Sequence, residues 1–272
     1  MRWASYAYSP LILKVQFYIE VVQFNFNVGS MKGGLMTCFI TGDIHGTHDI
    51  WKLSEFSEGR GTELTKADYL IIAGDFGLLW YPEGSEEDKK DAGWLEWLND
   101  RPWTTLFVDG NHENMNRLNS MHITKWHGGK IHMVKNSIYH LMRGQVFDID
   151  GKKFFTLGGA YSHDKQWRTE GLSWWPEEVP SHEERNEALM NLDANDWKID
   201  YVVTHDAPIS ITKRLIEHKW DRNTDEYEEW LQTEIADKLD FKHWYFGHHH
   251  TDYCVGDNGR YQALYYNIVE ID

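Results

Sequence analysis

Five stretches of this sequence share one form, in which a short apolar run stops at side chains that can bind a metal ion. The five runs end at the following motifs: Gly42-Asp43-Ile44-His45, Gly74-Asp75, Gly110-Asn111-His112-Glu113, Thr204-His205 and Gly247-His248-His249-His250. Runs rich in Ile, Val, Phe and Tyr that stop at Gly or Thr predict buried β-strands. In open α/β sheets, ligands bind beyond the carboxyl ends of the strands. The five motifs therefore predict one shared site.

The donor atoms of these motifs are oxygen and nitrogen, with no sulfur. Such a set suits Mn²⁺, Fe, Zn²⁺ or Co²⁺ and also admits Mg²⁺, and Mn²⁺ is our first expectation. Asp75 follows an almost wholly apolar run, where an unpaired carboxylate would be costly, and a position between two cations would offset that cost. A helix-capping aspartate is the alternative explanation.

Spacing within the motifs suggests how the side chains are arranged. Alternate residues of an extended segment point to one side, so Asp43 and His45 could face one ion. By the same rule His248 and His250 share a face and His249 points away, although a solvated polar turn would also explain three histidines. Next to Asn111, which offers a neutral oxygen ligand, His112 is free for acid–base chemistry.

Taken together and in this order, the five motifs resemble the calcineurin-like metallophosphoesterase superfamily, and they span residues 42–250. The resemblance implies a four-layer α/β/β/α sandwich of two mixed sheets flanked by helices. It implies a dinuclear metal centre that activates a water to attack a phosphomonoester or phosphodiester, with His112 as the general acid. One metal would be held by Asp43, His45, Asp75 and His250, and the second by Asp75, Asn111, His205 and His248, with Asp75 bridging.

The sequence departs from the protein serine/threonine phosphatase branch of that superfamily. Where that branch has Asp-Arg-Gly, this chain has Leu78-Leu79-Trp80, and Val108-Asp109 stands where the branch has a phosphate-gripping arginine. Leu78 occupies the position of the carboxylate that would orient His112, so the partner of His112 is left unassigned. A smaller bacterial- or phage-type phosphoesterase is the better match. The alternative is a non-catalytic member of the fold that binds a ligand or a partner.

One further segment could contact substrate. The loop that follows the run Phe154–Leu157 carries Lys165 and Arg168, either of which could grip a non-bridging phosphate oxygen. The pair Trp174-Trp175 could stack on a flat leaving group. An ordinary solvated loop and a structural aromatic turn are the competing interpretations.

The order of elements agrees with two packed sheets in one domain over residues 36–272. Helix signals cover three stretches: Ser85–Asn99, Ser181 to about Asn195 with a capping box at Ser181 and Glu184, and Thr224–Leu239. Short strands are predicted in the middle and at the end of the sequence: Tyr139–Met142, Gln145–Ile149, Phe154–Leu157 and the region Tyr261–Ile271. Strand–helix units on both sides of an antiparallel centre predict helices outside two sheets.

Residues 1–35 form an N-terminal extension of uncertain status. Lys14 and Glu20 interrupt its apolar part, which argues against both a membrane span and a signal peptide. The segment could be dispensable, with Met31 or Met36 as the natural start. Alternatively it adds an edge hairpin, because its apolar residues alternate at period two.

Composition limits the partners. A formal charge of −16 over 272 residues argues against a surface that tracks long nucleic acid, yet it allows a small phosphorylated substrate such as a nucleotide. Two cysteines without CxxC spacing favour a reducing compartment, so we expect a cytoplasmic protein without membrane contact. The sequence does not define an oligomeric state.

Overall fold

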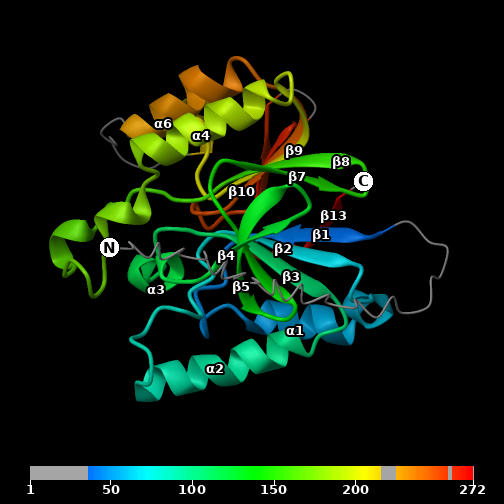
Figure 1. Ribbon diagram of the computed structural model, residues 1–272, viewed down its shortest axis with the longest axis vertical. Helices are drawn as coiled ribbons and strands as arrows, with labels where there is room; N and C mark the ends of the chain where they lie inside the picture. Colours follow the sequence, from blue (N-terminus) through cyan, green and yellow to red (C-terminus); the bar gives the residue numbers. More distant parts are fainter. Residues whose placement is uncertain (1–35, 216–224, 257–258, 272) are drawn as a thin grey trace, which may run out of the picture. The chain divides into compact units, whose positions relative to one another are not determined.

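A computed structural model of the chain describes residues 36–215, 225–256 and 259–271, and the predicted extension 1–35 lies outside the described residues (Figure 1). The strands of the described part are β1 (Cys38–Thr41), β2 (Tyr69–Ala73), β3 (Thr104–Val108), β4 (Ile123–Trp126), β5 (Gly129–Lys135), β6 (Ile138–Leu141), β7 (Gln145–Ile149), β8 (Lys152–Leu157), β9 (Lys198–Thr204), β10 (Asp240–Phe246), β11 (Tyr253–Val255), β12 (Tyr261–Ala263) and β13 (Val269–Ile271). The α-helices are α1 (Trp51–Glu58), α2 (Glu86–Asn99), α3 (Met115–Asn119), α4 (His182–Asp193), α5 (Ile209–Leu215) and α6 (Glu226–Trp230). Shorter turns of helix are η1 (Arg60–Glu63), η2 (Lys165–Trp167), η3 (Pro176–Glu178) and the π-helical η4 (Leu231–Ala236).

The strands form two mixed sheets within the described residues. The first has the order β13-β1-β2-β3-β6-β5-β4, and the second has the order β11-β12-β10-β9-β8-β7. In the first sheet β1, β2 and β3 are parallel neighbours, and in the second β9 and β10 are parallel neighbours. Parallel neighbours end at the same edge of a sheet, so each sheet brings the ends of its motif-bearing strands together.

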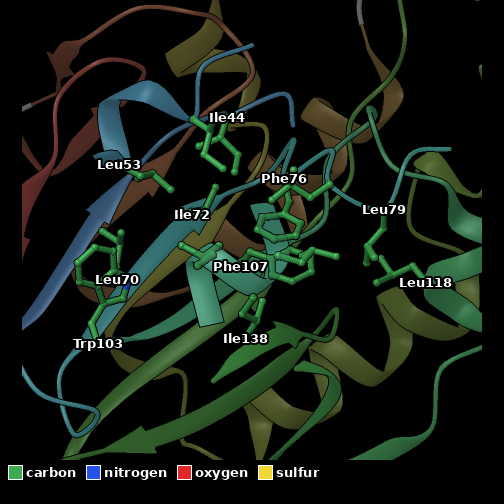
Figure 2. Packing of buried hydrophobic residues seen from close by; sticks show 14 of the residues in the cluster. Ile44, Leu53, Leu70, Ile72, Phe76, Leu79, Trp103, Phe107, Leu118 and Ile138 are labelled. Carbon is green, nitrogen blue, oxygen red and sulfur yellow. The ribbon is translucent and has the colours of Figure 1, made fainter. Parts of the chain in front are cut away.

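Alternation along the strands separates the layers of the first sheet. Leu70 and Ile72 of β2 point into a cluster that α1, α2 and α3 cover (Figure 2), whereas Ile71 and Ala73 point into a cluster between the two sheets. This division follows from the pleat, which sends successive side chains to opposite faces. All four residues are fully buried, as expected for parallel strands covered on both faces.

The second sheet repeats this division. Tyr201 and Val203 of β9 contribute to the cluster between the sheets, whereas Val202 packs with residues of α4, α6 and η4 in a third cluster. Figure 1 shows α4 and α6 over the second sheet, and α1 and α2 over the outer face of the first. The layers are therefore helix, sheet, sheet and helix, which confirms the predicted α/β/β/α sandwich.

The predicted helix signals are confirmed by the caps of the helices. Ser85 caps α2 by accepting the N–H of Asp88 at 3.1 Å. At α4 the Ser181–Glu184 capping box is complete. The helix expected over Thr224–Leu239 divides into α6, capped by Asp225, and the π-helical η4 that follows it directly.

The strands predicted at the end of the sequence divide between the two sheets. β12 pairs with β10 and β11, whereas β13 crosses to the first sheet and pairs antiparallel with β1. In the middle of the chain, β7 has the predicted bounds, and β6 and β8 begin one and two residues earlier than predicted. No helix in the described part of the chain combines the length and the apolar character needed to cross a bilayer.

Candidate metal centre

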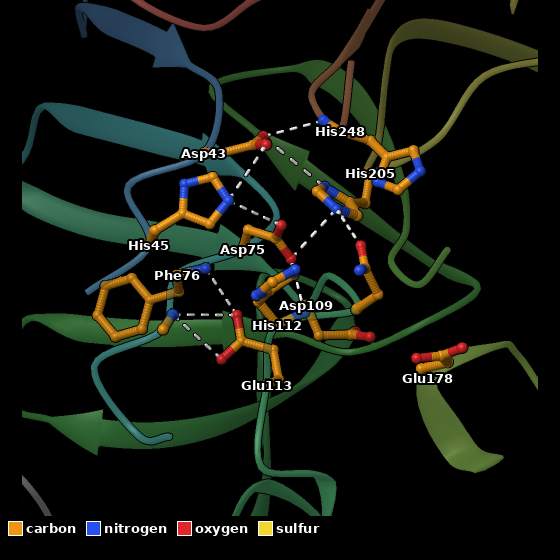
Figure 3. A network of polar contacts seen from close by, with 12 residues as sticks. Asp43, His45, Asp75, Phe76, Asp109, His112, Glu113, Glu178, His205 and His248 are labelled. Atoms are coloured by element: carbon orange, nitrogen blue, oxygen red, sulfur yellow. Dashed lines mark hydrogen bonds and ion pairs between the residues drawn. The ribbon is translucent and has the colours of Figure 1, made fainter. Parts of the chain in front are cut away.

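The five motifs follow five strands, as the sequence predicts. Figure 3 shows Asp43, His45, Asp75, His205 and His248 close together. Asp43, Asp75 and Asn111 follow β1, β2 and β3 of the first sheet. His205 follows β9 and the three consecutive histidines follow β10, which are neighbours in the second sheet. The structure therefore places the motifs at the ends of neighbouring strands in each sheet.

The first group of donors contains Asp43, His45, Asp75 and His250, which offer ligand atoms within 4.8 Å of one another. The Nε2 atom of His250 lies 3.2 Å from Asp43 Oδ2, and the Nε2 atom of His45 lies 3.2 Å from Asp75 Oδ2. Asp43 Oδ2 is buried and accepts no hydrogen bond from the described residues. A buried carboxylate oxygen without a donor, facing imidazole nitrogens, fits a bound cation.

The second group lies on the other oxygen of Asp75. The Nε2 atom of His205 is 3.2 Å from Asp75 Oδ1 and 3.2 Å from Asn111 Oδ1. The ring of His248 lies beside that of His205, with ring centroids 5.0 Å apart. Asp75 therefore faces one group with Oδ2 and the other with Oδ1, which is the arrangement that a bridging carboxylate requires.

The tautomers of two histidines leave their Nε2 atoms available as ligands. His205 Nδ1 lies 2.9 Å from the carbonyl oxygen of Ala73, which can only accept a hydrogen bond. His45 Nδ1 lies 2.9 Å from Asp49 Oδ2. In both rings Nδ1 donates to an oxygen, so Nε2 is the nitrogen that faces Asp75 and that would bind an ion after losing its own proton. Metal-ligating histidines are usually held in this way.

The backbone at the site is not extended, so the alternation of side chains along an extended segment does not explain why the paired motif residues share a face. His45, Asp75, His248 and His250 all have positive φ, at 42°, 45°, 64° and 48°. The pairs Asp43/His45 and His248/His250 therefore lie on tight turns and not on extended segments with alternating side chains. The N–H groups of Ile44 and His45 both donate to the carbonyl oxygen of Asp75, at 3.1 and 2.8 Å. His249 does point elsewhere, with Nε2 3.0 Å from Asp206 Oδ1.

Two glycines allow the backbone to approach the carboxylates closely. A Cβ at Gly110 would lie 2.0 Å from Asp75 Oδ1, and a Cβ at Gly247 would lie 2.1 Å from Asp43 Oδ1. The N–H groups of His112 and His248, one or two residues further on, donate to these same oxygens at 2.8 and 3.0 Å. Glycine is thus required at both positions for steric reasons.

The buried carboxylates make the site strongly attractive to cations. Burial opposes ionisation of Asp75, yet the positive charge of His205 and the hydrogen bonds from His205 and His45 hold its pKa well below the usual range. Burial also opposes charge on the histidines, but Asp75 raises the pKa of His45 to about 9 and that of His205 to about 10. Burial lowers the pKa of His248 to about 3, which keeps this imidazole neutral, the form that binds metals.

His112 has a partner that the sequence left unassigned. Its Nε2 atom lies 3.0 Å from Nη2 of Arg168, and its ring stacks on Trp80 with centroids 5.8 Å apart. A guanidinium can only donate, so Nε2 of His112 is the acceptor in this contact. Burial lowers the pKa of His112, which agrees with a neutral ring. The described side-chain partner of His112 Nε2 is therefore an arginine and not a carboxylate.

Three residues near the ligands escaped the sequence reasoning. Asp49 holds His45 Nδ1, and Tyr265 donates its hydroxyl to Asp49 Oδ2 at 3.2 Å. The ring of Tyr265 also stacks on His250, with centroids 4.8 Å apart. Glu113 accepts the N–H of Phe76 at 2.6 Å, and burial raises the pKa of its carboxyl well above the usual range (Figure 3). Only Glu113 stands inside a motif, so no signal in the sequence points to the other two.

Residues 36–252 match the family model of the calcineurin-like phosphoesterases, and the chain belongs to this family. It is similar to the lariat debranching enzyme of Schizosaccharomyces pombe, at 28% identity over 214 residues. The match covers 71% of this chain and 45% of that enzyme, so the chain spans about half the length of this relative.

Two solved structures were also compared with the chain. The phosphopantetheinyl hydrolase PptH of Mycobacterium tuberculosis is 16% identical and has a TM-score of 0.39. The match covers 85% of this chain and 89% of the PptH chain. The sulfate thiohydrolase SoxB of Thermus thermophilus is 11% identical and has a TM-score of 0.42. The match covers 85% of this chain and 51% of the SoxB chain. The family membership, together with the assembled donors, supports the hydrolysis of a phosphoester.

Proposed function

We propose that this chain is a metal-dependent phosphoesterase, which hydrolyses a phosphomonoester or phosphodiester at a dinuclear centre. The observation that carries this proposal is the position of Asp75 between two sets of donors, with Oδ2 3.2 Å from His45 and Oδ1 3.2 Å from His205. A dinuclear site needs a bridging ligand of this kind, and hydrolysis of phosphate esters is a common use of such sites.

The residues would divide between two ions as the family resemblance implies. The first set is Asp43, His45, Asp75 and His250, and the second set is Asp75, Asn111, His205 and His248. When bound, two divalent cations would acidify a water and offset the negative charge of the phosphoryl group. The donors are oxygen and nitrogen, so Mn²⁺ is our first candidate and Zn²⁺, Fe, Co²⁺ and Mg²⁺ are alternatives.

His112 is the proposed general acid. It lies between the ligand Asn111 and the buried Glu113, and its backbone N–H is fixed on Asp75 Oδ1 at 2.8 Å. Its imidazole reaches the edge of the centre, where the rings of His112 and His45 meet with centroids 5.3 Å apart. For this role Nε2 of His112 must first take up a proton, and donation of that proton to the departing oxygen would accelerate hydrolysis by roughly 10²–10⁴-fold.

The substrate that we propose is small and phosphorylated, such as a nucleotide. The name of the fission yeast relative describes the debranching of a lariat, which is also phosphoester chemistry. A formal charge of −16 disfavours long nucleic acid as the substrate of this chain. An exposed free cysteine, Cys254, supports a reducing compartment such as the cytoplasm.

The test is metal-restored hydrolysis. Metal-stripped protein is assayed with bis-p-nitrophenyl phosphate and with p-nitrophenyl phosphate, each with Mn²⁺, Zn²⁺ or Mg²⁺ added back. We expect turnover to return with at least one metal, and the preferred ester distinguishes a diesterase from a phosphatase. Two bound ions without turnover of either ester would favour the alternative, a non-catalytic binding protein.

A further inference from the structure

Arg168 reaches the metal centre from a segment that contains none of the five motifs. It follows η2 in the loop between β8 and η3, and its side chain is 14% exposed. Its Nη2 atom lies 3.0 Å from His112 Nε2. A guanidinium is therefore held beside the proposed general acid, at the side of the centre where a leaving group would depart.

The three nitrogens of this guanidinium have unequal partners. Nε lies 2.8 Å from Asp164 Oδ1 and Nη1 donates to the carbonyl oxygen of Ser173 at 3.4 Å, so two contacts come from the loop itself. The third partner, His112, is a neutral acceptor. Because ionised acceptors form stronger bonds with a guanidinium, a phosphoryl oxygen would displace the imidazole. The contact with His112 is thus the exchangeable one.

The base of this loop is fixed to the metal-binding segments. Ser162 donates its N–H and its hydroxyl to the buried carboxylate of Glu178, at 2.8 and 2.7 Å. The side-chain N–H of Asn111 donates to the same hydroxyl at 3.1 Å. Gly159 donates its N–H to the carbonyl oxygen of Asp109 at 2.9 Å. The base of the loop that carries Arg168 is therefore tied by hydrogen bonds to Asp109 and to Asn111 of the proposed second metal site, which limits the entropy lost when a substrate binds.

We propose that Arg168 binds a non-bridging oxygen of the substrate's phosphoryl group, and that Asp164 positions its guanidinium for this purpose. The inference rests on the proposed phosphoesterase function and adds a recognition element to it. The chemical class that Arg168 selects is an anionic phosphoryl group, since its fork of donors matches two oxygens of one phosphate. The contact of Nη2 with the phosphoryl group would replace its contact with His112 Nε2.

The experiment compares Arg168→Ala and Arg168→Lys with the matched control Arg101→Ala, an arginine that packs on Trp97 at the end of α2. Binding of inorganic phosphate to the metal-loaded full chain is measured by calorimetry, and KM and kcat are measured for the better chromogenic ester. For Arg168→Ala we expect the Kd for phosphate and the KM to rise about tenfold or more, because a charged hydrogen bond is lost. The Kd for phosphate and the KM of Arg168→Lys should lie between those of the alanine variant and the wild type. The metal content of all variants should be unchanged.

The variant Asp164→Asn separates the positioning of the Arg168 guanidinium from its contact with phosphate. Its carboxylate is exposed and touches Arg168 only through Nε, so this variant keeps the guanidinium but loosens it. We expect KM and the Kd for phosphate to rise by less than in Arg168→Ala, with kcat changed less than KM. Equal phosphate affinity and KM in wild type and Arg168→Ala would reject the inference. Absence of turnover in the wild type with every metal would instead reject the phosphoesterase proposal, and the phosphate-binding comparison would still decide the role of Arg168.

Discussion

At the scale of single residues, the centre depends most on Asp75. One of its oxygens faces His45, the other faces His205, and the second also accepts the N–H of His112 at 2.8 Å. It is 1% exposed, and the charged histidines keep it ionised despite its burial. Asp43 also has one oxygen toward each set, but its Oδ1 lies 3.9 Å from Nδ1 of His205, a nitrogen whose partner is the carbonyl oxygen of Ala73.

Asp75→Asn should therefore weaken binding at both metals. An amide keeps one oxygen and nearly the same shape, but it loses the negative charge and one of the two ligand oxygens. We expect fewer than two ions per chain after gel filtration, measured by elemental analysis, and a large loss of metal-restored hydrolysis. Asp193→Asn at the exposed end of α4 is the control. Full occupancy of two ions in Asp75→Asn would disprove the bridging role.

Tyr265→Phe tests a residue next to two proposed ligands of the first metal. Tyr265 contacts His250 directly and reaches His45 through Asp49. The change removes the hydroxyl that donates to Asp49 and keeps the ring that stacks on His250. Partners of ligating histidines typically change metal affinity by about 10–100-fold when they are lost. We expect Mn²⁺ affinity, measured by calorimetry on metal-stripped protein, to fall by about tenfold. Tyr253→Phe at an exposed position is the control, and unchanged affinity in Tyr265→Phe would show that the hydroxyl does not position His45.

The proposed ligands could be named from the sequence because each closely follows an apolar strand. Arg168 and Tyr265 could not be assigned, because their contacts join residues 56 and 216 positions apart. Local spacing carries no signal for such pairs. Arg168 was noted as a candidate for gripping phosphate, but its contact with His112 required the structure.

At the scale of elements, the site is made by turns that follow strands. Apolar runs predicted β1, β2, β3, β9 and β10, and the caps predicted α2 and α4. The turns themselves were described wrongly as extended, since four proposed ligands have positive φ. Such conformations are uncommon outside glycine, although Asp and His adopt them more readily than most residues, so no simple pattern in the sequence reveals them.

The neighbouring strands β5 and β6 contain a buried pair of histidines that should make stability depend on pH. His132 and His140 lie with their Nδ1 atoms 3.1 Å apart, and burial lowers the pKa of His132 to about 4 from its ordinary value of 6.5. Between these values the unfolded chain binds a proton at His132 and the folded chain does not. The free energy of unfolding should therefore fall as pH decreases from 6.5 to 4, with this residue contributing on the order of 2 kcal/mol.

His132→Asn removes the titrating group and keeps a donor for His140. Urea unfolding at several pH values between 4 and 7 should give a shallower dependence of stability on pH for the variant than for the wild type. The comparison of slopes removes the contribution of the carboxylates, which both proteins share. Equal slopes would show that His132 does not remain neutral in the folded chain.

At the scale of the whole molecule, the sandwich packs two sheets face to face and brings the ends of their strands together at one site. The first sheet supplies Asp43, Asp75 and Asn111, and the second supplies His205 and His250. Fold class and layers were predictable because the periodicity of strands and helices is local. The crossing of β13 to the first sheet could not be predicted, because a strand of three residues is too short for a clear alternation of apolar and polar residues.

Removal of residues 1–35 should leave a folded and active protein. Met36–Asp272 forms one compact unit, and the family match begins at residue 36. We expect the shortened chain to be soluble, with the same urea midpoint and the same metal-restored turnover as the full chain. Insoluble protein or a lower midpoint would instead support the alternative that this segment is an integral edge hairpin.

The bond between Tyr265 and Asp49 has a consequence for how the protein folds. It spans 216 positions, and the bond from the N–H of His248 to Asp43 spans 205. Contacts of such long range form slowly, because closing a large loop loses entropy before the contact is gained. Until that step the carboxylates of Asp43 and Asp75 lack their histidines from the second sheet. Metal capture should therefore follow the pairing of the two halves of the chain, and an ion added early in refolding should not accelerate it.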